Sequence, residues 1–105
     1  MTEMPHISRT SVQAALDRLL TVAMSNTGQS RIAANFLLAW WNAAELGGFD
    51  LADLFSIDRA IANDMAIIFA FLGQQGGAVY PDAFDGRAEI VALIRMWRRI
   101  DADAA

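Results

Sequence analysis

The chain has 105 residues, of which 55% are hydrophobic and 19% charged, and it carries a formal net charge of −4. A chain of this length fits one domain, and so apolar a composition argues against an intrinsically disordered protein. The absence of cysteine excludes disulfides, thiolate metal sites and cysteine nucleophiles, and the acidic total argues against direct binding to nucleic acid.

The first predicted helix covers residues 11–24, where apolar side chains recur at helical spacing from Val12 to Ala23. Thr10 and Gln13 have the spacing of a capping box, in which each side chain bonds a backbone N–H that the first helical turn leaves unpaired. We therefore expect this helix to begin just after Thr10.

A second helix is predicted over residues 29–46, with Thr27 as its cap and a wide apolar face. The pair Gly47 and Gly48 ends it, because two glycines in a helix interior would cost too much backbone entropy. A short helical turn capped by Asp50 is expected to follow.

The third long helix is predicted over residues 59–72, with Asp58 as its cap. Its second half, residues 65–72, is apolar on every side, so the rest of the fold encloses it or a partner chain covers it. An eight-residue apolar run is also compatible with a buried strand, but this one continues a capped helical pattern.

A loop over residues 73–86 precedes the last predicted helix, residues 87–100, which Asp85 or Gly86 starts. The apolar stripe of this helix is expected to be core and consists of Ile90, Leu93, Ile94, Trp97 and Ile100. The predicted fold is all-α: a single small bundle of four main helices plus a short fifth. The expected divisions are a flexible N-terminal arm (1–9), the helical bundle domain (10–100) and a frayed tail (101–105).

Several short strings along the chain carry a family resemblance. They are NTGQSR at 26–31, FLLAWWNA at 36–43, GGFDL at 47–51, DRAIANDM at 58–65, the pair Tyr80 and Pro81, and Trp97. With them the chain resembles, over most of residues 12–98, an uncharacterised bacterial domain-of-unknown-function family. That family is met mainly in proteobacterial genomes and on integrative or conjugative elements. The resemblance implies a small protein without an assigned activity and brings no catalytic residues.

Two features are candidates for partner binding. Trp41 follows Trp40 directly, so both rings pack in the core or Trp41 emerges at a protein–protein surface. Residues 46–85 hold six aspartates and one arginine, a net charge of −5, and Asp50, Asp53 and Asp64 are the candidates for an acidic binding face. The simpler reading is that Asp50, Asp58 and Asp85 are helix caps. The arginines of residues 95–99 are expected to form a solvated face beside a helix end.

The sequence contains few of the residues that usually carry enzyme catalysis. His6 is the only histidine, so neither a serine–histidine pair nor a histidine-rich metal site can be assembled. We expect no catalytic residue, cofactor or metal; acid/base work by Asp50, Asp53 or Glu45 stays an alternative that needs a pocket lined by carboxylates. With no secretory signal and no apolar run near 20 residues, a cytoplasmic location is expected.

The leading hypothesis is a non-enzymatic protein–protein interaction module, accessory to a mobile element and self-associating, with a homodimer as one form. This hypothesis rests on residues 65–72, which are more apolar than one buried helix side requires. The alternative is a counter-defence protein of the anti-CRISPR kind, whose acidic centre binds a basic nucleic-acid-binding protein. The identity of the partner is left open by both hypotheses.

Overall fold

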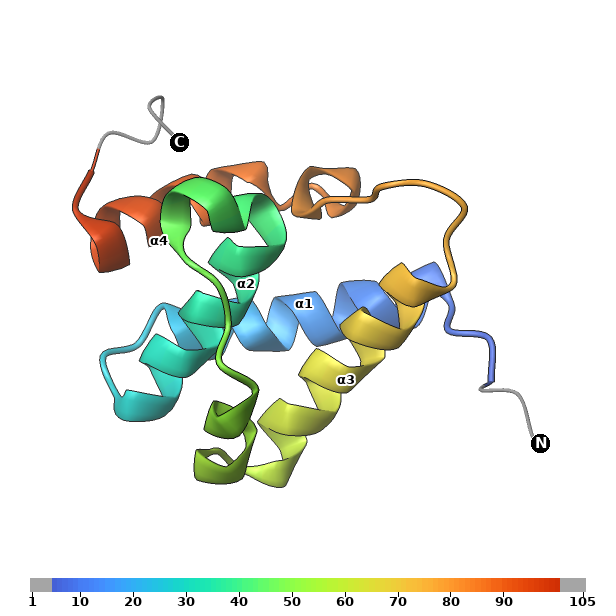
Figure 1. Ribbon diagram of the computed structural model, residues 1–105, viewed down its shortest axis with the longest axis horizontal. Coiled ribbons are helices and arrows are strands. Elements are labelled where there is room, and N and C mark those ends of the chain that lie inside the picture. The colour runs from blue at the N-terminus through green and yellow to red at the C-terminus, as the bar shows by residue number, and fades with distance from the viewer. Residues whose placement is uncertain (1–4, 101–105) are drawn as a thin grey trace.

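A computed structural model describes residues 5–100 as a helical bundle (Figure 1). Its elements in chain order are α1 (Arg9–Ala23), α2 (Gly28–Leu46), the 3-10 helix η1 (Leu51–Ser56), α3 (Arg59–Gly73), the 3-10 helix η2 (Pro81–Phe84) and α4 (Arg87–Arg98). These residues contain no strand, so the predicted all-α class with four main helices and a short one is confirmed. None of the helices in this part of the chain is long and apolar enough to cross a membrane.

The helix α1 is the centre of the arrangement (Figure 1). Both α2 and α3 pack against α1, and α4 packs against α2, whereas α2 and α3 make few backbone-level contacts with each other. The buried face of α1 is fully covered at Val12, Ala15, Leu16 and Leu19. Because α2 and α3 share α1 as a support but diverge from each other, a space remains between them.

The start of α1 differs from the prediction. Ser8, and not Thr10, is the cap: its hydroxyl accepts a hydrogen bond from the backbone N–H of Ser11 at 3.1 Å. The capping box was therefore wrong, and Gln13 instead donates to Asp17 one turn further along. Two polar side chains near one helix start compete for the cap position, and sequence spacing alone did not decide between them.

The predicted N-terminal arm lies partly within the described residues. Arg9 belongs to α1, and the side chain of Gln74 holds the backbone just before it. The N–H of Ile7 donates to Gln74 Oε1 at 2.9 Å, and Gln74 Nε2 donates to the carbonyl of Pro5 at 2.9 Å. Residues 1–4 of the arm, and the predicted tail at 101–105, lie outside the described part of the chain.

The helix α2 begins as predicted, because the hydroxyl of Thr27 accepts from the N–H of Ser30 at 3.0 Å. Near its end the backbone of Asn42 leaves helical geometry, and Asn42 Oδ1 accepts from the N–H of Glu45, which restarts the last turn. Gly47 then ends α2 with φ at +97°, a conformation that favours glycine.

Of the three aspartates expected to be caps, Asp50 and Asp58 occupy N-cap positions, but only Asp50 makes a side-chain capping bond. Its carboxylate accepts from the N–H of Ala52 at 2.9 Å at the start of η1. Asp58 makes no side-chain capping bond to α3, because its carboxylate instead accepts from Gln29 Nε2. Asp85 ends η2 with φ at +57°, so Gly86 is the residue that precedes α4.

The apolar stripe of α4 is confirmed at its first three positions, since Ile90, Leu93 and Ile94 are fully buried. Trp97 is partly buried, and its indole N–H donates to the carbonyl of Ala23 at 2.9 Å. Ile100 was wrongly expected in the core: α4 ends at Arg98, Arg99 takes φ at +56°, and the side chain of Ile100 is 43% exposed.

Arg98 was expected to be solvated, which is also wrong. Its Nε donates to the carbonyl of Leu46 at 2.9 Å, and one terminal nitrogen donates to Asn35 Oδ1 at 2.7 Å. Leu46 is the last residue of α2, where carbonyls lack helical partners and attract cations. Arg98 therefore ties the end of α4 to α2.

One ion pair is present within residues 5–100, and it joins α1 to α3. Arg18 donates from Nε and from a terminal nitrogen to both carboxylate oxygens of Asp64, with the shortest contact at 2.8 Å. These hydrogen bonds, and then the negative charge of Asp64, raise the pKa of Arg18 above its ordinary value. The ion pair thus links α3 to α1 at this point.

Replacing Arg18 with methionine is expected to lower the unfolding temperature, because it leaves the carboxylate of Asp64 largely buried without its cation. Adding Asp64→Leu removes that charge, so the double variant is expected to unfold at a higher temperature than Arg18→Met alone. Thermal unfolding followed by circular dichroism for the four chains of this cycle measures the coupling. A double variant less stable than Arg18→Met would contradict the account.

Candidate functional site

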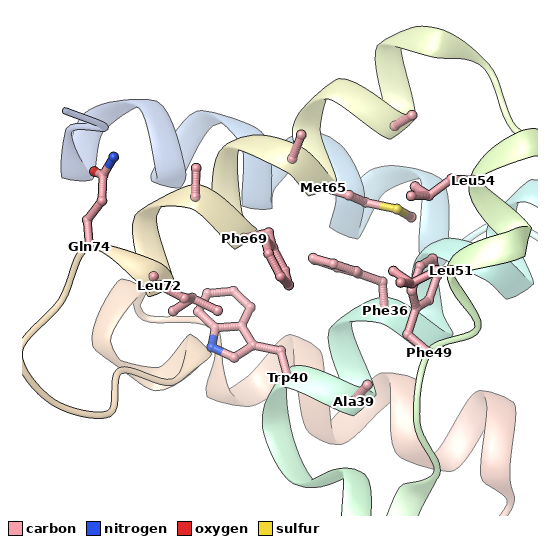
Figure 2. A pocket seen from close by; sticks show the side chains of 14 residues that line it. Phe36, Ala39, Trp40, Phe49, Leu51, Leu54, Met65, Phe69, Leu72 and Gln74 are labelled. Carbon is pink, nitrogen blue, oxygen red and sulfur yellow. The ribbon is translucent and has the colours of Figure 1, made fainter. Parts of the chain in front are cut away.

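The space between α2, η1 and α3 is an open apolar cavity of about 970 Å³, which we call the α2–α3 cleft (Figure 2). Its lining residues come from these three elements and the chain next to them: Phe36, Ala39, Trp40, Phe49, Leu51, Leu54, Ala62, Met65, Ala66, Phe69, Ala70, Leu72, Gly73 and Gln74. None of them belongs to α1. The cleft is thus a consequence of how α2 and α3 diverge.

The run at residues 65–72 forms one wall of the cleft. Met65, Ile68 and Phe71 are buried, whereas Phe69 lines the cleft with 70% of its surface exposed. The fold therefore encloses one side of this run and leaves the other side open, and coverage of the open side by a partner chain stays a prediction.

Aromatic side chains from α2 form the opposite wall and are held in place by specific contacts. The ring of Phe36 meets that of Phe49 edge to face, with centroids 5.4 Å apart. The indole N–H of Trp40 donates to the carbonyl of Val79 at 2.8 Å, which satisfies its polar atom. In Figure 2, Phe36 and Trp40 extend from α2 toward the same space that Phe69 enters from α3.

The side chains that line the cleft are almost all apolar. No lining residue is ionisable, and the amide of Gln74 is occupied by the backbone of Pro5 and Ile7. Asp50, Asp53 and Glu45, the carboxylates considered for acid/base work, do not line it. Among residues 5–100, no group of three His, Asp or Glu side chains could hold a metal ion.

Two of the four predicted partner-binding residues are chain neighbours of residues that line the cleft, although they do not line it themselves. Asp50 and Asp53 are on η1 or at its start, directly before the lining residues Leu51 and Leu54. Asp64 lies elsewhere, because its side chain is paired with Arg18 and the residue is only 7% exposed.

Trp41 also lies outside the cleft lining. It is partly buried, and the guanidinium carbon of Arg87 sits 5.6 Å from its ring centroid. Trp41 was the candidate predicted from the sequence, whereas Trp40 is the tryptophan that lines the cleft and Trp41 faces Arg87 of α4.

Sequence reasoning missed the residues at the mouth of the cleft, Leu51 and Phe69, which are 68% and 70% exposed. The all-round apolar character of residues 65–72 had indicated surplus apolar surface, but it did not single out Phe69 within that run. A helix that packs on one neighbour can bury only one side of such a run, so the surplus had to be exposed somewhere.

The fold and the cleft together define a small all-helical domain with an open apolar cleft. The model of a family of unknown function (DUF7673) matches residues 13–98, and the chain belongs to this family. No curated protein and no solved structure gave a match. Membership confirms that the resemblance is to a family of unknown function, and it assigns no activity and no site residue.

Proposed function

We propose that the protein is a non-enzymatic protein-interaction module that self-associates through the α2–α3 cleft. The observation that carries the proposal is the exposure of Phe69 and Leu51 at the mouth of an apolar cavity. Burying a leucine or phenylalanine side chain is favourable by roughly 1.5–3 kcal/mol, so covering these residues would drive association. Contiguous apolar surface of this kind marks an interaction site.

The exposure of the residues at its mouth suits the cleft to a protein rather than a small molecule. Small-ligand pockets bury most of the ligand surface, which requires walls that close around it. Here a lining phenylalanine and a lining leucine stand mostly in solvent, so the surface suits side chains presented by another folded chain. The absence of ionisable groups from the lining supports binding without catalysis.

The mobile-element role and the counter-defence alternative are supported by fewer observations than self-association. An accessory role on a mobile element rests on the family resemblance alone. The counter-defence alternative needs an exposed acidic face, and it stays a prediction. The positions of Asp50 and Asp53 on or beside η1 support this alternative. Asp64 does not support it, because its carboxylate is paired with Arg18.

Self-association is tested by light scattering across a concentration series. The wild-type chain is expected to gain mass with concentration, and Phe69→Gln is expected to weaken the association at least about tenfold, since tenfold corresponds to only about 1.4 kcal/mol. Met24→Gln, which removes a partly exposed apolar side chain outside the cleft lining, is the matched control and should behave as wild type.

A wild-type chain that stays monomeric at every concentration would reject self-association. A Phe69→Gln chain that associates like wild type would show that the α2–α3 cleft is not the surface involved.

A further inference from the structure

We infer that the α2–α3 cleft receives the basic C-terminal end of α4 from a second copy of the chain, so that copies associate head to tail. This inference rests on the proposed self-association and names the surface that fills the cleft. We call this surface the α4 end; it consists of Arg95, Met96, Arg99 and Ile100.

The α4 end combines exposed apolar and basic side chains. Met96 is 38% exposed and Ile100 is 43% exposed, and Arg95 and Arg99 beside them are exposed as well. Residues 87–100 hold four arginines and one glutamate, a net charge of +3. When Asp101 and Asp103 are counted, residues 87–105 still carry +1, against −5 for residues 46–85.

The edge of the cleft has the opposite charge. Asp50 and Asp53 accompany the lining residues Leu51 and Leu54, and neither belongs to the single ion pair found in residues 5–100. The nearby Arg59 points its guanidinium at the carbonyls of Leu54 and Ile57. An apolar surface with an acidic edge therefore faces solvent, and the α4 end is its complement in charge and in apolar character.

A symmetric contact fits these charges less well. In an isologous dimer built cleft to cleft, two surfaces with the same acidic edge meet, and their like charge disfavours the contact. Figure 1 shows α4 on the opposite side of the molecule from η1, so a chain cannot fill its own cleft with its own α4 end. A heterologous contact between two copies satisfies both observations.

Head-to-tail contacts leave one free cleft and one free α4 end on every assembly. Growth therefore continues past the dimer unless the rotation between copies closes a ring. The contact should also weaken with salt, because raising the ionic strength from about 0.01 M to 0.1 M shortens the screening length from about 30 Å to 10 Å.

A mixing experiment separates the two surfaces. One variant, Phe69→Gln, has an impaired cleft and an intact α4 end. The other, Arg95→Asp with Arg99→Asp, has an intact cleft and a reversed α4 end. Each variant alone is expected to lose association at least about tenfold, and an equimolar mixture is expected to form a one-to-one complex that grows no further. Sedimentation velocity with native mass spectrometry reads out the stoichiometry.

A matched control and a rescue complete the design. Arg87→Asp changes an arginine at the other end of α4 and should associate as wild type. Reversing both surfaces in one chain, with Asp50→Arg, Asp53→Arg, Arg95→Asp and Arg99→Asp, is expected to restore association. Circular dichroism on every variant confirms that each one is folded.

The outcomes distinguish the two proposals. If wild type is monomeric throughout, self-association fails and the head-to-tail contact fails with it. If the Arg95→Asp, Arg99→Asp chain associates as wild type while Phe69→Gln does not, the cleft is the interface and the α4 end is not its occupant. A mixture of folded variants that remains monomeric also overturns the head-to-tail contact.

Discussion

Leu93→Ala is expected to lower the free energy of unfolding by about 2–5 kcal/mol. Leu93 is fully buried in α4, within the one hydrophobic core of the domain. Truncation removes the transfer free energy of the side chain and leaves a cavity that close-packed neighbours fill only in part. Small domains are stable by about 5–15 kcal/mol, so a large fraction of the stability is at stake. Equilibrium unfolding in urea measures the change.

The matched control is Leu51→Ala, which makes the same chemical change at a residue that is 68% exposed. It is expected to change stability by no more than about 0.5 kcal/mol, because surface substitutions rarely do more. Equal effects at the two positions would mean that α4 does not pack as described.

Arg98→Met is expected to cost about 1.5–3 kcal/mol, the usual range for hydrogen bonds made by a charged group. Methionine retains much of the apolar stem of arginine but removes the donors to Leu46 and Asn35. The end of α2 then loses both a carbonyl partner and the favourable charge at its C-terminus. Urea unfolding monitored by tryptophan fluorescence measures this loss.

Arg95→Met is the control, since Arg95 lies on the same helix but is exposed. Its effect on stability should stay within about 0.5 kcal/mol. Arg98→Lys should fall between Arg98→Met and wild type, because lysine keeps the charge but lacks the planar fork that reaches two acceptors. If the Arg95 and Arg98 variants are equally stable, the tie between α4 and α2 contributes nothing.

The helices were predictable because each of them carries apolar side chains at helical spacing between recognisable breakers. Thr27, the two glycines after α2 and Asp50 acted as expected. The errors lay at ends where several polar residues compete. Ser8 caps α1 in place of Thr10, and Asp58 bonds a glutamine on α2 because that side chain is brought close only in the folded chain.

The cleft was not predictable in the same way. Periodicity shows that a helix has an apolar side, but it does not show which of its neighbours that side meets. Residues 65–72 are apolar all round, so nothing local distinguishes Phe71, which is buried, from Phe69, which is exposed. That difference depends on the direction in which α3 crosses α1.

The partners of the charged residues were unpredictable for the same reason, because local sequence does not show which elements meet in the fold. Asp64 and Arg98 look like surface residues in the sequence, yet each finds a partner more than 40 positions away in the chain. Asp50 and Asp53 lie at the start of η1 and within it, next in the chain to the lining residues Leu51 and Leu54; Asp50 is exposed and Asp53 is half-buried. Local sequence thus indicated the apolar run and the nearby aspartates separately, but it did not show how the fold places them relative to each other.

The position of α1 behind both walls has a consequence for how binding preference can change. No residue of α1 lines the cleft, yet α2 and α3 both rest on it, so the bulk of its buried side chains sets the distance between the walls. The fully buried side chains of α1 include Val12, Ala15, Leu16 and Leu19. Exchanging them for larger or smaller apolar residues would retune the shape that the cleft accepts while every residue able to touch a partner remains the same.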